Sequence, residues 1–135
     1  MTLTLSTASR DAMAAALVGP LDGGTIEIRS GTRPDTPNTA ATGTVLATIA
    51  LADPAFSAGG AGVVNMADPP SVDATASGTA TWFRAYDGSA AAVFDGKVTQ
   101  TGGGGDLELA TTAITTGLAV DITGGTITMP VGTAD

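Results

Sequence analysis

The segment TATWFRAYDGSAAAVFDG, residues 79–96, decides the fold of this chain. It contains four of the five aromatic side chains, namely Trp82, Phe83, Tyr86 and Phe94. The tetrapeptide Y-D-G-S is typical of a hairpin turn, in which Gly88 is free to adopt a positive φ. We therefore predict a long strand over residues 74–87 that returns over residues 91–95.

Strand alternation divides these aromatic side chains between two faces. Trp82, Arg84 and Tyr86 share one face, and Phe83 falls on the other. An exposed ligand platform would gather its rings on one face, so the division favours a central strand buried on both sides. We interpret the aromatics as core packing, with a partner interface or a sugar platform as the alternatives. Arg84 is expected to lie over Trp82 or Tyr86, or to pair with an acid.

Residues 6–19 predict one short helix. Ser6 or Thr7 can cap its first amide groups, and apolar residues recur inside it at helical spacing. Gly19 and Pro20 follow in the order that ends a helix.

Alternating apolar residues predict strands between this helix and the aromatic segment. In residues 24–30, Ile26 and Ile28 fall on one face, and charged residues fall on the other. Residues 44–51 form a second strand candidate, whose irregular apolar spacing indicates a bulge or burial on both faces. Residues 63–66 form a third, shorter strand candidate.

The C-terminal third of the chain is also expected to be β. Residues 106–114 place two leucines on one face. Residues 117–131 predict a hairpin, because apolar residues alternate on both sides of Gly124-Gly125, a pair suited to a tight turn. Pro130 favours an edge position, since proline cannot donate to a sheet ladder.

Segments rich in proline, glycine and small residues are predicted to be loops between these elements. They cover residues 32–43, 52–62, 67–73 and 101–105. We interpret the last of these, TGGGG, as a flexible connection. The whole pattern predicts an all-β protein, an antiparallel β-sandwich or barrel-like fold of about seven to eight strands with one short N-terminal helix. Residues 1–135 are expected to form a single domain, with the β region over residues 24–131.

Charge and composition narrow the classes of partner. The net charge is −8, and the five cationic residues are scattered along the chain. Nucleic-acid binding needs clustered Lys and Arg, so no nucleic-acid partner is predicted. An acidic surface is repelled by anionic lipids, and no segment approaches about 18 consecutive apolar residues, so no membrane partner is predicted either. The thin apolar core favours self-association or docking onto something larger.

The residue types that support common catalytic chemistry are scarce. The chain has no histidine and no cysteine, which removes the usual proton shuttle and the thiolate metal ligands. No serine occupies a nucleophile-elbow pattern, and the glycines of residues 101–105 lack a phosphate-loop lysine. We therefore predict no enzyme activity, no catalytic residue, no metal and no cofactor. A carboxylate pair or a structural calcium ion are the alternatives.

The polar segment SGTRPDTP, residues 30–37, is the candidate docking loop. Two prolines stiffen it, and a stiff loop loses little conformational entropy on binding. The alternative is a plain crossover loop in which Arg33 pairs with Asp35. The predicted partner contacts are Arg33, Pro34 and Pro37 of this loop, Phe56 of the next loop, and the edge near Pro130.

Three motifs occur in a fixed order: S-G-T-R-P-x-T-P at residues 30–37, D-P-A-F at 53–56, and T-W-F-R-A-Y-D-G-x(5)-F-D-G at 81–96. Over about residues 7–131, the chain resembles small accessory virion proteins of tailed bacteriophages. The resemblance implies a structural part of the virion, either a capsid decoration (cement) protein that binds the major capsid protein or a tail, neck or fibre component. It implies self-association and no catalytic residues. A carbohydrate- or receptor-binding module and an enzyme are the alternatives from other classes.

Overall fold

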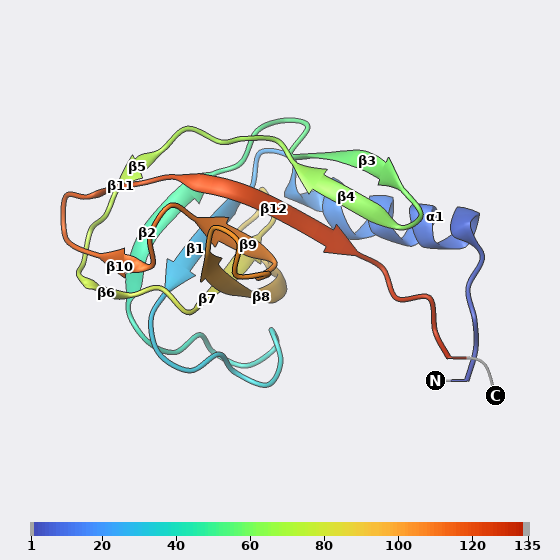
Figure 1. Cartoon of the computed structure of the whole chain (residues 1–135), viewed down its shortest axis with the longest axis horizontal. Helices are drawn as coiled ribbons and strands as arrows, with labels where there is room; N and C mark the ends of the chain where they lie inside the picture. The colour runs from blue at the N-terminus through green and yellow to red at the C-terminus, as the bar shows by residue number, and fades with distance from the viewer. Residues whose placement is uncertain (1, 134–135) are drawn as a thin grey trace.

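The computed structural model describes residues 2–133, which form one curled, mixed β-sheet with one α-helix beside it (Figure 1). In sheet order, its eight strands are β2 (Val45–Ala50), β1 (Thr25–Arg29), β7 (Trp82–Tyr86), β8 (Ala92–Gln100), β9 (Leu107–Leu109), β12 (Ile122–Thr128), β4 (Val63–Met66) and β3 (Phe56–Gly60). Two small ladders join β6 (Gly78–Thr79) to β10 (Ala113–Ile114) and β5 (Val72–Asp73) to β11 (Ala119–Val120). The predicted all-β fold with one N-terminal helix is confirmed.

The helix α1 (Thr7–Val18) begins where its capping residue predicts. The hydroxyl of Ser6 accepts a hydrogen bond of 3.1 Å from the amide of Ser9. The α-helix ends as expected, but the chain continues through Pro20 into a 3₁₀ turn, η1 (Gly19–Leu21), before it enters the sheet. α1 packs against the hairpin formed by β3 and β4.

The first two strands follow their apolar patterns. Ile26 and Ile28 of β1 are both fully buried. Ile28 pairs with Ala47 of β2, whereas the next residue, Arg29, pairs with Val45, so Leu46 is the extra residue of a bulge. Both Leu46 and Ala47 are buried, which confirms the predicted irregularity.

The aromatic hairpin is formed by β7 and β8. Its central strand is buried on both sides, as predicted, because residues 82–85 are all buried between β1 and β8. The predicted length of residues 74–87 is wrong: β7 covers five residues, and the preceding Gly78 and Thr79 pair instead with β10. The turn also differs, since Ala90 has the positive φ of 64° that we expected at Gly88.

The predicted C-terminal hairpin is wrong. Gly124 and Gly125 lie inside the continuous strand β12 and pair there with Glu108 and Leu107 of β9. Glycine at this position reflects close approach rather than a turn, because a Cβ on Gly125 would lie 3.0 Å from the Cβ of Met66.

The predicted loop over residues 52–62 contains a strand. Residues 56–60 form β3, which pairs antiparallel with β4. The segment FSAGG has no apolar alternation, and its glycine and small residues therefore predicted a loop. Phe56 therefore lies in a strand and not in a loop.

One strand pair departs from the antiparallel prediction, since β8 and β9 run parallel. A parallel pair normally needs a crossover of about a dozen residues or more, yet residues 101–106 suffice because they fold back over Thr99. A Cβ on Gly103 would lie 2.7 Å from the Cβ of Thr99, and the Glu108 carboxylate accepts hydrogen bonds from the amides of Gly102 and Gly104. The interpretation of this loop as a flexible connection is therefore wrong.

Candidate functional site

A buried ion pair is the centre of the polar face of β1, β7 and β8. Arg84 of β7 lies opposite Asp95 of β8. Its Nε and Nη2 atoms donate to the two carboxylate oxygens at 2.6 and 2.9 Å, and the side chains are 4% and 5% exposed. The hydrogen bond to Asp95 raises the pKa of Arg84 above its ordinary value despite the opposing effect of burial. Arg84 therefore remains charged, and its expected pairing with an acid is confirmed.

Two guanidinium groups lie close to the Trp82 ring on this face. The Cζ atoms of Arg29 and Arg84 lie 5.8 and 5.6 Å from the centre of the Trp82 ring, within the range of a cation–π interaction. The indole Nε1 donates to the carbonyl of Ser30 at 3.1 Å. Trp82 is 1% exposed, so it cannot serve as the open sugar platform that was the alternative.

The other aromatic side chains serve packing. Phe83 is buried on the opposite face, and Phe94 meets it edge-on with ring centres 6.0 Å apart. Tyr86 is half-buried at the end of β7. Burial raises the pKa of Tyr86, and nearby Glu27 adds to that effect. We call residues Glu27, Arg29, Trp82, Arg84, Tyr86 and Asp95 the ion-pair face.

The ion-pair face holds a long loop, residues 30–44, which we call the supported loop. Nη1 of Arg84 donates to the carbonyl of Thr39 at 2.8 Å. Nη1 of Arg29 donates to the carbonyl of Thr42 at 3.3 Å. At the base of the loop, the Ser30 amide donates to the Thr44 carbonyl at 3.1 Å. The buried Arg84 and the half-buried Arg29 thus fix the path of an exposed loop.

The three predicted contact residues of this loop lie along its first half. Arg33 is exposed, and Pro34 and Pro37 are half-buried. Within residues 2–133, the ion pairs are Arg29–Glu27 and Arg84–Asp95, so the local pair between Arg33 and Asp35 is not formed. Arg33 presents its charge to the solvent.

The other predicted contacts lie elsewhere. Phe56 is 8% exposed and its side chain packs in the core, so this side chain offers little area to a partner. Pro130 is exposed just beyond the end of β12, which β9 and β4 flank, so the edge position predicted near Pro130 is wrong. The supported loop and β3 are on opposite sides of the molecule (Figure 1), so the structure does not bring these residues together.

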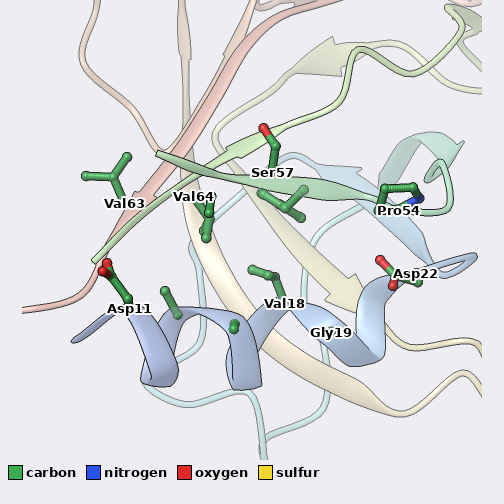
Figure 2. Close-up of a pocket in the computed structure, with 12 residues that line it drawn as sticks. Asp11, Val18, Gly19, Asp22, Pro54, Ser57, Val63 and Val64 are labelled. Atoms are coloured by element: carbon green, nitrogen blue, oxygen red, sulfur yellow. The ribbon is translucent and has the colours of Figure 1, made fainter. Parts of the chain in front are cut away.

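A groove of about 200 Å³ separates α1 from the β3–β4 hairpin (Figure 2). Its walls are mainly small and apolar, with the carboxylates of Asp11 and Asp22 toward its two ends. Each carboxylate accepts a backbone hydrogen bond, from Gly62 at 2.6 Å and from Ala55 at 2.8 Å. Asp11 thus holds the turn between β3 and β4, and Asp22 holds the residue that precedes β3, which are structural tasks.

Sequence reasoning predicted an acid as one possible partner of Arg84 but did not identify Asp95 or Thr39. The register of the hairpin shifts between Ala85 and Tyr86, and this bulge moves Asp95 opposite Arg84, where simple counting from the turn would place Phe94. The Arg84–Thr39 contact joins residues 45 positions apart, and no local pattern marks it.

Residues 2–133 contain no group of three or more potential metal-ligating side chains. Within the same residues, no helix is long and apolar enough to span a membrane. Comparisons with protein-family models, curated proteins and solved structures found no match to this chain.

Proposed function

We propose that this chain is a non-enzymatic structural protein of a tailed-bacteriophage virion. Its proposed role is capsid decoration, in which it binds the major capsid protein through the supported loop and stabilises the shell. The proposal combines the motif resemblance described above with the geometry of that loop.

The observation that carries the proposal is the convergence of two of the three motifs. Thr81 and Trp82, from the hairpin motif, donate side-chain hydrogen bonds to the carbonyls of Gly31 and Ser30, from the loop motif, at 2.6 and 3.1 Å. Arg84 of the hairpin motif then holds Thr39, just beyond the loop motif. Residues of the hairpin motif therefore hold and position the exposed loop that contains the loop motif.

A loop of this kind suits attachment to a large partner. Its conformation is set before binding, so association costs little additional conformational entropy. Arg33 adds a solvent-exposed guanidinium, which can pair bidentately with a carboxylate of the partner. A capsid surface with an acidic residue beside a shallow apolar patch would match Arg33 together with Pro34 and Pro37.

Binding to shells that lack the protein tests the role of the loop. The double variant Arg33→Ala/Pro34→Ala should bind such shells at least about tenfold more weakly, as expected when an interface arginine is truncated. Its melting temperature should fall by no more than a few degrees, because neither side chain is buried and the loss of Pro34 costs only about 0.4–1 kcal/mol through the unfolded state. Lys97→Ala removes another exposed cation and is the matched control, which should bind normally. Equal binding by all three proteins would refute loop attachment.

Cryo-electron microscopy of the source particle tests the location. Symmetric copies of this chain on the shell are expected for capsid decoration. Density confined to the tail, neck or fibres would replace the decoration role with the alternative virion role. Absence from the particle would overturn both.

A further inference from the structure

The two ends of the sheet differ in how they are covered. The sheet ends at β2 on one side and at β3 on the other. At the β2 end, the amide of Thr75 donates to the carbonyl of Leu46 at 2.9 Å, and β5 packs alongside. At the β3 end, the described residues 2–133 place no strand beyond β3. β3 is therefore the open edge of the sheet.

The backbone of β3 directs hydrogen-bonding groups away from the sheet. The amide of Ala67 donates to the carbonyl of Ala55 at 2.8 Å, in register with the β3–β4 ladder. Because bonding groups alternate along an antiparallel strand, the N–H and C=O of Phe56 and Ala58 point outward, and those of Ser57 point toward β4. An extended backbone is the natural partner for such groups.

The protection of this edge against pairing is limited to the short length of β3 and a bulge between Ala58 and Gly60. Native edge strands commonly carry charges, proline or a covering element. The residues of β3 carry no charge and no proline, and residues 57–60 are exposed. The helix α1 packs against the hairpin but leaves the groove of Figure 2 along β3.

We propose that β3 pairs antiparallel with β3 of a second copy of this chain, across a two-fold axis. A strand edge pairs with another strand, and among residues 2–133 the β3 edge has no strand beyond it, whereas Thr75 already donates to Leu46 at the β2 edge. Two-fold pairing brings the same uncharged edge to both sides, which is the self-complementarity that an isologous interface needs. Small side chains at residues 57–60 let the two backbones approach without burying a charge. This inference does not depend on the proposed function.

Sedimentation velocity over a range of protein concentrations tests the pairing. The wild-type chain should form a species of twice its 13.0 kDa mass. Ala58→Pro removes one outward N–H while sparing the β4 ladder, and it should be monomeric. Ala58→Ser keeps that N–H and should dimerise like the wild type. A wild-type chain that stays monomeric at every concentration, or a folded Ala58→Pro variant that still dimerises, would overturn the proposal.

Hydrogen exchange of the wild type gives a second test that needs no folded proline variant. At high concentration, the amides of Phe56 and Ala58 should exchange at least about tenfold more slowly than at high dilution. The amide of Ser57 faces β4 and should be protected in both conditions, so it is the internal reference. Equal exchange of the Phe56 and Ala58 amides at the two concentrations would overturn the proposal. A folded monomeric variant should still bind shells, which separates this result from a failure of the capsid role.

Discussion

The ion-pair face and the hairpin end, which consists of α1, β3 and β4, use their residues in opposite ways. The ion-pair face concentrates large and charged side chains, buries Trp82 and the Arg84–Asp95 pair, and fixes the supported loop above them. The hairpin end is built largely from alanine, glycine and valine, and leaves a groove and an open strand edge. One region therefore presents a fixed loop to the solvent, whereas the other presents the unpaired backbone groups of a strand edge.

Loss of the buried ion pair should cause the largest effect. Arg84→Met leaves the Asp95 carboxylate buried without its partner and frees the Thr39 carbonyl. We expect the free energy of unfolding to fall by about 3–5 kcal/mol, as measured for other broken buried pairs. Urea denaturation of the isolated protein measures the change.

Removal of both charges provides the control for this effect. Arg84→Met/Asp95→Leu leaves no buried charge, so it should recover most of the lost stability. The supported loop should nevertheless lose its anchor, which the amide exchange of residues 36–42 would report. If Arg84→Met costs less than about 1 kcal/mol, the ion-pair face is not the rigid region of this comparison.

The base of the supported loop should be the next most sensitive point. Gly43 has a φ of +74°, and a Cβ there would lie 1.8 Å from the Ser30 carbonyl oxygen. Gly43→Ala should therefore cost about 2 kcal/mol of unfolding free energy, from backbone strain and the displaced loop base. Calorimetry measures the change. Gly104→Ala is the matched control, because Gly104 has a φ of +79° with no atom within 4 Å of a Cβ. An equal cost for both variants would mean that strain alone acts at Gly43.

The two regions also differ in how well their sequences predict them. Ile26 and Ile28 predict β1 because two buried isoleucines alternate with the less buried, charged Glu27 and Arg29. The aromatic hairpin was predictable for the same reason, and Arg84 was correctly expected to pair with an acid or stack on an aromatic ring. Side chains with strong preferences for burial or charge carry most of the local information.

The hairpin end carries little such information. The glycine and alanine residues of β3 favour neither face, so a strand over residues 56–60 is set by pairing with β4, which is a tertiary effect. Gly124 and Gly125 were misread because a turn and a close strand approach both require glycine, and only the packing of Met66 distinguishes them. The supported loop was recognised from its prolines, but its arginine anchors depend on long-range contacts.

The pH dependence of stability should reveal how far the ion-pair face extends along β7. Burial raises the pKa of Tyr86 in the folded protein, whereas the unfolded chain releases the phenol proton near pH 10. Above that pH, the unfolded state binds fewer protons than the folded state, so the free energy of unfolding should fall as pH rises. Tyr86→Phe removes this titration and should flatten the pH profile of urea denaturation above about pH 10. Identical profiles for both proteins would mean that Tyr86 titrates freely.

The smallest expected changes in stability come from substitutions in one turn of each region. Ala90, between β7 and β8, and Ala61, between β3 and β4, have positive φ values of 64° and 52°. A left-handed conformation costs an alanine about 1–2 kcal/mol, and glycine avoids that strain but adds about 0.4–1 kcal/mol of unfolded-state entropy. Ala90→Gly and Ala61→Gly should each raise the free energy of unfolding by about 0.5–1 kcal/mol. Ala91→Gly, with no positive φ to relieve, should lower it. Urea denaturation measures both changes. A gain in stability at Ala90 but not at Ala61 would mean that the hairpin end opens before the rest of the chain unfolds. The two regions would then differ in local stability as well as in composition.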